Sequence, residues 1–273
     1  MSSGPQITRV RHELKRRRLT VARVEQVAPA MVRVVLSGGE LQGFTSLGFD
    51  DHVKLFFPSL QQGEMPASAS GLVGSKSLAE NTPLVMRDFT PRRFDPDTGE
   101  LWIDFFLHEA GPAASWASRV AVGESLDVGG PKGSAVISPE GIDAHILIGD
   151  ETALPAISRR LEELPAGARA LVILEVDAGS AWPSLESRAA LEVILVTRKE
   201  GPGIAAQELI ERLRALAFPA GRCFVWIALE SQSARAIRRY LREERNIDKD
   251  WIKAAAYWKR GAVGTHERIE DDE

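Results

Sequence analysis

Cysteine is almost absent from this chain, which has a single Cys223 among its 273 residues. Without a second cysteine an intrachain disulfide framework is excluded, and a reducing compartment is expected. We expect Cys223 to be a buried structural thiol, because it begins the apolar run 223–227. One cysteine and five histidines without ligand spacing also give no reason to expect a zinc or iron site formed by the protein.

Long hydrophobic runs are missing as well. No stretch approaches the roughly 20 apolar residues that cross a bilayer, and residues 1–20 are polar and basic, without the apolar centre of a secretion signal. Excess positive charge is also missing, since 34 Lys and Arg stand against 38 Asp and Glu. We therefore expect a cytoplasmic monomer that neither inserts into a membrane nor binds nucleic acid.

The composition that remains is that of a packed protein, with 44% hydrophobic and 26% charged residues. A chain of this length favours two domains. In the first half, short alternating segments are interrupted by Gly and Pro, which is typical of an antiparallel barrel. We expect its strands at 20–27, 31–36, 53–57, 101–107 and 125–128, with a long surface loop at 61–83.

After Pro139 the pattern changes to apolar strands that alternate with amphipathic helices, which predicts a parallel sheet covered on both faces. The predicted fold is thus an antiparallel β barrel over 1–140 followed by an α/β domain over 141–273, joined at about 138–143. The expected strands are 145–149, 170–176, 191–196, 223–229 and 252–258, the last of the series, and the expected helices are 153–164, 205–216 and 233–244. The charged tail 267–273 is expected to be disordered.

A first candidate site lies at Arg87, Phe89 and Thr90. If this segment is extended, Arg87 and Phe89 share one face and Thr90 takes the other. The Arg87 guanidinium would suit the pyrophosphate of a flavin cofactor, and the Phe89 ring would suit its ring system. The Thr90 hydroxyl would suit one of its heteroatoms. A solvated arginine-rich turn before a strand would look the same, so the segment alone leaves both interpretations open.

A second candidate site is the turn at 111–117, where Gly and Pro lead into a helix start made of small residues. Backbone N–H groups with little side-chain bulk in front of them bind anions, and Ser115 can add a hydroxyl donor. A diphosphate would fit there. A capped surface helix is the alternative interpretation.

Together these segments resemble the siderophore-interacting protein family, which comprises FAD-containing ferric-siderophore reductases within the ferredoxin-reductase superfamily. The resemblance spans about Arg9 to Trp258. It rests on an ordered series of segments, namely 9–14, 50–58, 87–92, 104–108, 111–116, 130–134 and 254–258.

The resemblance implies that Arg87 holds the FAD pyrophosphate and that Thr90, the expected catalytic residue, bonds the ring near its reactive nitrogen. The cofactor-binding residues it implies in the first half are Arg87, Asp88, Phe89, Thr90, Asp104, Phe105, Leu107, His108, Gly111, Pro112, Ala113, Ala114, Ser115 and Trp116. The family usually has Tyr where this chain has Phe89. Ring stacking survives that change, but one hydroxyl hydrogen bond is lost, which is expected to shift FAD affinity or potential modestly.

The second half is expected to bind the nicotinamide dinucleotide at the strand-to-helix turn 149–155, where α/β sheets place their ligands. The turn lacks the G-x-G-x-x-G fingerprint, and the resemblance implies instead that Thr152 lies close to the nicotinamide. The arginines 159–160 are candidate phosphate contacts, but we expect them on a solvated helix face. Glu175 and Asp177 end the next strand and would disfavour NADPH unless they turn away, so NADH and NADPH both remain candidates.

The resemblance places basic substrate-binding residues at Lys54, Lys132 and Lys253, although a solvated surface charge is the alternative for each. Many ferric siderophores are anionic, so local positive charge would attract them. The resulting hypothesis is a ferric-siderophore reductase that passes electrons from NADH or NADPH through FAD to the siderophore-bound iron. The alternatives are a flavin-dependent reductase of free flavin, ferredoxin or quinone, and a non-catalytic siderophore-binding module.

Overall fold

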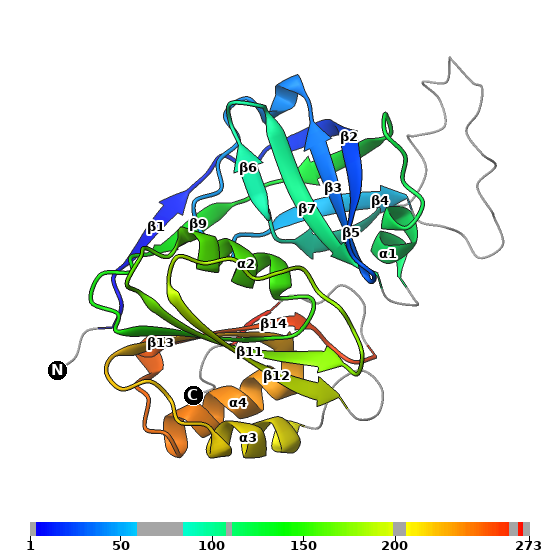
Figure 1. Cartoon of the computed structure of the whole chain (residues 1–273). Helices are drawn as coiled ribbons and strands as arrows, with labels where there is room; N and C mark the ends of the chain where they lie inside the picture. Colours follow the sequence, from blue (N-terminus) through cyan, green and yellow to red (C-terminus); the bar gives the residue numbers. More distant parts are fainter. Residues whose placement is uncertain (1–3, 59–83, 108–110, 199–205, 262–266, 270–273) are drawn as a thin grey trace.

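The computed structural model describes residues 4–58, 84–107, 111–198, 206–261 and 267–269, which form two packed units (Figure 1). The predicted loop at 61–83 and His108 lie outside the described residues. None of the helices in these ranges is long and apolar enough to cross a bilayer.

The first unit is a curved antiparallel sheet of seven strands in the order β5-β4-β8-β2-β3-β7-β6. A buried core of Val, Leu and Phe fills its interior, which confirms the barrel-like architecture. A separate two-stranded ribbon pairs β1 (Ile7–Arg11) with β9 (Gly133–Ile137). The seven strands are β2 (Arg16–Ala28), β3 (Met31–Ser37), β4 (Val53–Pro58), β5 (Leu84–Phe89), β6 (Arg93–Asp95), β7 (Glu100–Phe106) and β8 (Ser125–Gly129), with a short turn η1 (Gly39–Leu41) and α1 (Pro112–Ala117) between them.

The second unit is a six-stranded sheet in the order β12-β11-β10-β13-β14-β15, in which β10 to β14 are parallel. Its strands are β10 (Ala144–Gly149), β11 (Arg169–Asp177), β12 (Ala190–Arg198), β13 (Cys223–Glu230), β14 (Ile252–Trp258) and β15 (Glu267–Ile269). Its helices are α2 (Leu154–Glu163), α3 (Ala206–Ala215), α4 (Ser231–Glu243) and the short η2 (Lys249–Trp251).

The prediction for the C-terminal end was wrong in two respects. β14 is not the last strand, because β15 pairs with it in antiparallel orientation. The segment 267–269 is therefore not a disordered tail. Ile269 is buried in the core beneath α4, and this one apolar residue among charged neighbours gives the strand its anchor.

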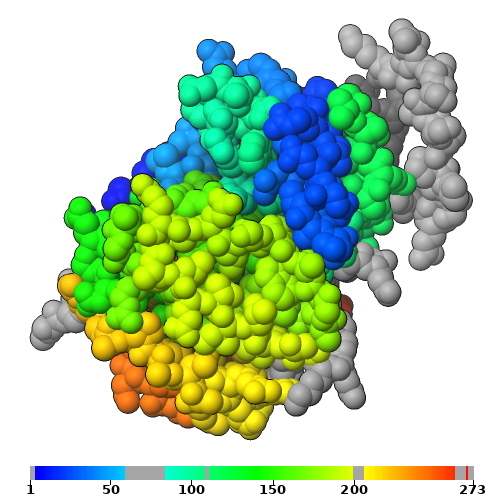
Figure 2. All heavy atoms as spheres, in the orientation of Figure 1, coloured from blue at the N-terminus to red at the C-terminus, as the bar shows by residue number. Residues whose placement is uncertain are grey.

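The two faces of the second sheet have different coverings. Helices α3 and α4 pack on one face, whereas α2 lies on the other face and between the sheet and the barrel (Figure 1). Barrel residues such as Met31 and Phe49 belong to the same buried cluster as Leu147 and Trp226, and Figure 2 shows the atoms of the two units in contact. The expectation of a solvated face for Arg159 and Arg160 was therefore wrong, since this face of α2 is covered.

A buried histidine in β10 makes folding stability depend on pH. His145 is 1% exposed, and neither ring nitrogen has a hydrogen-bond partner among the described residues. Burial, with the nearby Arg160 guanidinium, lowers the pKa of His145 to about 3. His145 therefore takes up a proton near pH 6.5 in the unfolded chain, whereas in the folded chain it stays neutral down to about pH 3. The free energy of unfolding consequently falls as the pH drops below 6.5.

Between pH 7 and pH 5 this single group should remove about 2 kcal/mol of stability. Replacing His145 with leucine should abolish that part of the pH dependence, which urea denaturation at the two pH values would measure. Leu147→Met, on the same face of β10, is the matched control and should keep the wild-type pH dependence. An unchanged dependence in His145→Leu would show that His145 is protonated in the folded state.

Candidate functional site

Strand β5 presents Arg87 and Phe89 on one face, as the alternation predicts. Its antiparallel register sets Arg87 opposite Leu55 and Phe89 opposite Val53, both of which point into the barrel. The Arg87 guanidinium donates one hydrogen bond, to the Met86 carbonyl, and no carboxylate pairs with it among the described residues. Partial burial lowers the pKa of Arg87. Arg87 is therefore a partly desolvated cation whose other guanidinium N–H groups can donate to a ligand.

Phe89 lies at the edge of an aromatic cluster inside the barrel. Its ring centroid is 4.6 Å from that of Phe105 and 6.3 Å from that of Phe57, and Phe105 lies 5.6 Å from Trp116. Phe105 and Trp116 are buried, whereas Phe89 is half-buried. Phe105 therefore packs against Phe89 on the core side, and Trp116 packs against Phe105. Of these three rings, only that of Phe89 is partly exposed.

The turn before α1 has the small residues that the sequence predicted. Gly111 has φ of 140°, a conformation that side-chain-bearing residues rarely adopt, and Pro112 opens the helix. Ser115 is exposed, whereas Ala114 is buried against the barrel. Leu107 and Ala113 pack partly on the aromatic core.

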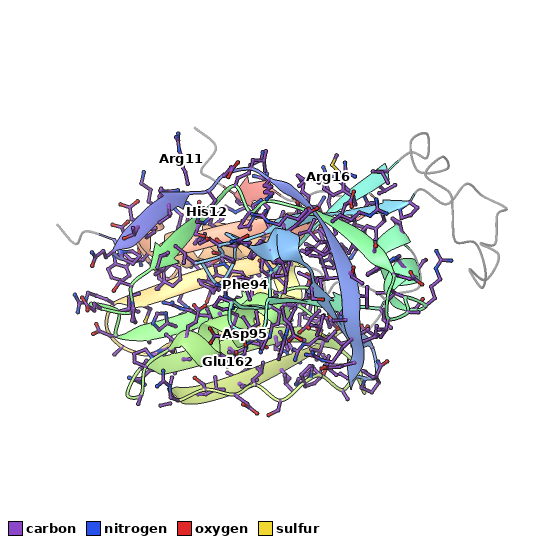
Figure 3. All side chains as sticks on the ribbon, turned by 90° about the horizontal axis from the view of Figure 1, so that it is seen from above. Arg11, His12, Arg16, Phe94, Asp95 and Glu162 are labelled. Atoms are coloured by element: carbon purple, nitrogen blue, oxygen red, sulfur yellow. The ribbon has the colours of Figure 1, made fainter. Side chains whose placement is uncertain are left out.

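Asp104 does not join this group. Successive residues of β7 point to opposite faces, so Asp104 faces away from Phe105 and toward α2. Its carboxylate accepts two hydrogen bonds from Arg33, at 2.7 and 2.8 Å, and lies 3.8 Å from Arg92. Arg92 in turn donates to Glu162 of α2 at 3.0 Å. Figure 3 labels Glu162 together with Phe94 and Asp95 of β6 in the same part of the view.

These charges line a hollow of about 240 Å³ between the barrel and α2, which also takes in Trp102 and Ser158. Asp104 is thus part of a contact between the two units.

Asp88 also faces away from Arg87, on the outer side of β5. It sits opposite Lys54 in the register, and the Lys54 ammonium donates to its carboxylate at 2.8 Å. Asp88 therefore neutralises one of the three predicted substrate lysines.

Thr90 follows the end of β5 and is buried against the second unit. Its hydroxyl shares a hydrogen bond with the phenol of Tyr257 on β14. In the sequence, Tyr257 is part of the closing segment of the family resemblance, and no role was predicted for it. The contact crosses between units, and no local pattern signals it.

Thr152 lies at the carboxyl end of β10, as predicted. Its backbone N–H donates to the Asp150 carboxylate at 2.9 Å, and the indole N–H of Trp258 donates to the same carboxylate at 2.7 Å. Burial raises the pKa of Asp150. Asp150 thereby ties the turn after β10 to the end of β14.

Arg198, at the end of β12, changes the expected charge near this turn. Its guanidinium is buried, donates to Asp177 at 2.7 Å, pairs with Glu151 and lies 3.9 Å from Glu175. Glu175 and Asp177 therefore do not stand as unscreened negative charges. Arg198 was not predicted from the sequence, although an arginine at the end of one strand beside acidic residues at the end of the next could have indicated it.

Lys54, Lys132 and Lys253 approach one short segment, 50–54. Lys253 donates to Asp50 at 2.9 Å, and Lys54 belongs to the segment itself. Lys132 follows the 130–131 turn, where Gly130 lies beside the His52 carbonyl. Lys132 is exposed and has no carboxylate partner among the described residues, so it is the uncompensated charge of the three.

The described residues contain no group of three or more His, Cys, Asp and Glu side chains able to hold a metal ion. The features that remain are the Arg87 and Phe89 face, the open turn at Gly111, the buried Thr90 hydroxyl and the lysines around 50–54.

Comparisons with known proteins match both units. A family model described as siderophore-interacting FAD-binding domain matches residues 20–135, and one described as siderophore-interacting protein matches residues 142–261. The chain is 37% identical over 257 residues to an NADPH-dependent ferric-chelate reductase of Escherichia coli, covering 92% of this chain and 95% of the relative. It is 34% identical to the ferric vibriobactin reductase ViuB of Vibrio cholerae, covering 90% of each.

Among solved structures, a siderophore utilization protein from T. fusca superposes with a TM-score of 0.82 at 35% identity, covering 95% of this chain and 98% of that one. A ferredoxin-NADP+ reductase from Plasmodium falciparum shares the fold, with a TM-score of 0.61 at 10% identity over 88% of this chain and 95% of that one. On the identity and coverage of these relatives, the chain belongs to the siderophore-interacting protein family.

Proposed function

We propose that this protein is a ferric-siderophore reductase that passes electrons from NADPH through FAD to siderophore-bound iron. The observation that carries the proposal is Arg87, a partly desolvated guanidinium without a carboxylate partner, on the same face as the half-buried Phe89. A cytoplasmic, monomeric protein divided at about residue 140 is part of the same proposal.

The residues present fit FAD. Arg87 would bind its diphosphate, the open turn from Gly111 to Ser115 would add backbone and hydroxyl donors, and Phe89 would lie against the ring. Thr90 would hold a proton toward the ring system, while Phe105 and Trp116 keep Phe89 in place. FAD supplies the step that no side chain can, because it accepts two electrons together and donates them singly.

The dinucleotide would bind beside Thr152, at the carboxyl ends of β10 and β11. Pairing of Asp177 with Arg198 removes the charge argument against a 2′-phosphate, and the Escherichia coli relative is named NADPH-dependent. We therefore propose NADPH as the donor in preference to NADH. No general acid or nucleophile is required, because the chemistry is electron transfer.

Lys132, which lies beside the carboxylate-paired Lys54 and Lys253, would attract the anionic ferric siderophore toward the flavin. Reduction then weakens the bond between iron and its hard oxygen ligands, since Fe(II) binds them less tightly than Fe(III). The protein contributes orientation and charge.

An anaerobic titration tests the proposal. The flavin absorbance of the purified protein should bleach with NADPH and recover when a ferric siderophore is added. Recovery with quinone or free flavin but not with a ferric siderophore would favour a general flavin reductase. Protein that stays colourless after incubation with FAD would favour a siderophore-binding module and contradict the proposal.

Lys132→Glu should raise the KM for an anionic ferric siderophore by about fivefold to tenfold at low salt, because a charge at the approach face governs association. The effect should shrink at high salt. Arg212→Glu on the exposed side of α3 is the control for the same charge change and should leave the KM unchanged. Equal effects of the two variants would show that net charge, and not Lys132, attracts the substrate.

A further inference from the structure

The N-terminal ribbon brings a histidine beside Lys132. The antiparallel register of β1 and β9 sets Arg11 opposite Gly133. The backbone N–H of the next residue, His12, donates to the Lys132 carbonyl at 3.0 Å. His12 and Lys132 therefore continue the register as opposite residues, whose side chains share one face of the ribbon. Arg11 takes the other face, and Figure 3 shows Arg11 standing out from the molecule while His12 lies within its outline.

The His12 ring is held by a buried serine. Its Nε2 atom lies 2.7 Å from the hydroxyl oxygen of Ser134, which is 6% exposed. Ser134 donates its only hydroxyl proton to the Asp51 carboxylate at 2.5 Å and accepts from the Leu47 backbone N–H at 3.0 Å. The Nε2 atom of His12 must therefore carry a hydrogen and donate it to Ser134. This contact fixes the orientation of the ring and the position of one of its protons.

Asp51 places a negative charge behind this serine. Its carboxylate is buried and also accepts from the Ser46 hydroxyl at 2.9 Å and from the Gly48 backbone N–H at 3.0 Å. No lysine or arginine pairs with Asp51 among the described residues. A carboxylate that orients an imidazole through hydrogen bonds is a common way to position a histidine for proton transfer. Asp51 also belongs to the segment 50–54 that the three lysines approach, so the histidine and the lysines face one region.

The other ring nitrogen of His12 is free. Its Nδ1 atom makes no hydrogen bond to any described residue, and it is accessible to solvent. The charged residues around the ring are Asp51 on its buried side, Lys132 opposite it in the ribbon, and its chain neighbours Arg11 and Glu13. Histidine is the side chain that most readily gains and loses a proton near neutral pH. Nδ1 can therefore take a proton from water and pass it to a ligand bound at Lys132.

Release of iron in the proposed function is favoured by a proton, although electron transfer itself needs none. One electron converts Fe(III) to Fe(II) and adds one negative charge to the complex. That charge stays on the oxygen ligand that leaves the iron unless a proton joins the oxygen. A general acid within hydrogen-bond distance of such an oxygen speeds the step.

We propose that His12 is a catalytic acid that protonates a siderophore oxygen as the iron is reduced. The inference rests on the proposed function, because the electron comes from NADPH through FAD. In this step the Nδ1–H bond of the His12 imidazolium and one Fe–O bond break, and one O–H bond forms. Iron goes from Fe(III) to Fe(II), and the neutral imidazole regains its proton from water. Lys132 binds the anionic complex, and His12 neutralises the oxygen that is released.

The test compares two acceptors that differ in their need for a proton. FAD in the protein is first reduced anaerobically with stoichiometric dithionite, so that NADPH binding does not enter. The protein is then mixed in a stopped-flow instrument with the ferric complex of 2,3-dihydroxybenzoate or with ferricyanide. Catecholate oxygens take up protons when the iron leaves, whereas ferricyanide keeps all its ligands on reduction. Flavin reoxidation is followed with both acceptors, and ferrozine traps the Fe(II) released from the catecholate complex.

His12→Gln keeps an N–H donor for Ser134 but has no proton to transfer. Release of Fe(II) from the catecholate complex should slow by about 100-fold, whereas ferricyanide should be reduced at the wild-type rate. In His12→Ala, added imidazole should restore part of the release rate, which a merely structural role would not allow. Arg9→Gln, on the exposed face of β1, is the matched control and should behave as the wild type with both acceptors.

An unchanged release rate in His12→Gln would overturn the inference. An equal loss with the two acceptors would also contradict it, because the variant would then act on the flavin or on binding and not on the proton. A loss in His52→Gln in place of His12→Gln would assign the proton to another histidine, in the segment 50–54, and would likewise reject His12. Failure of the reduced wild-type protein to pass electrons to the catecholate complex would instead overturn the proposed function itself.

Discussion

Replacing Arg87 with alanine should yield a folded protein that has lost most of its FAD. The guanidinium makes no ion pair among the described residues, so its removal leaves no buried carboxylate without a partner. A charge-assisted hydrogen bond to a phosphate contributes about 1.5–3 kcal/mol, so the Kd for FAD should rise roughly 10-fold to 150-fold. Fluorescence titration of the apoprotein with FAD would measure the change.

Arg87→Lys separates charge from geometry. Lysine keeps the positive charge but lacks the planar fork, so it should restore only part of the affinity. Arg23→Ala, which removes an exposed arginine paired with Glu25 and Glu100, is the control and should bind FAD normally. FAD affinity in Arg87→Ala equal to that of the control would contradict the assignment of this strand to the diphosphate.

Asp104→Ala should destabilise the protein while leaving FAD binding nearly unchanged. It leaves the half-buried Arg33 without its bidentate partner, so the free energy of unfolding should fall by about 3 kcal/mol. The Kd for FAD should change by less than about threefold, because the carboxylate faces away from Phe105 and Phe89. Chemical denaturation and FAD titration of the same preparation would measure both quantities.

Glu162→Ala provides the comparison. The Glu162 side chain is 43% exposed, so the loss of its pair with Arg92 should cost no more than about 1 kcal/mol. A tenfold loss of FAD affinity in Asp104→Ala with unchanged stability would instead assign Asp104 to the cofactor, as the family resemblance implied.

Asp104 and Arg87 illustrate which side-chain positions the sequence could predict and which it could not. Both stand in strand segments that resemble the family, and the resemblance assigned both to FAD. Alternation along β7 sends Asp104 and Phe105 to opposite faces, but which face meets the second unit is a property of how two units pack. Arg159 and Arg160 illustrate the same limit, because a helix covered by another domain carries arginines that look like those of a solvated helix.

By itself the sequence determined the two-part architecture, the positions of most strands and helices, the family, and the grouping of Arg87 with Phe89, because alternation, helical periodicity and turn residues act over short stretches of chain. The tertiary structure alone decided the antiparallel β15, the partners of Lys54 and Lys253, the network around Arg198 and the bond between Thr90 and Tyr257. The contacts of Lys253 with Asp50 and of Thr90 with Tyr257 form only when the two units pack together. The others join neighbouring strands within one unit, and they depend on how those strands assemble into a sheet.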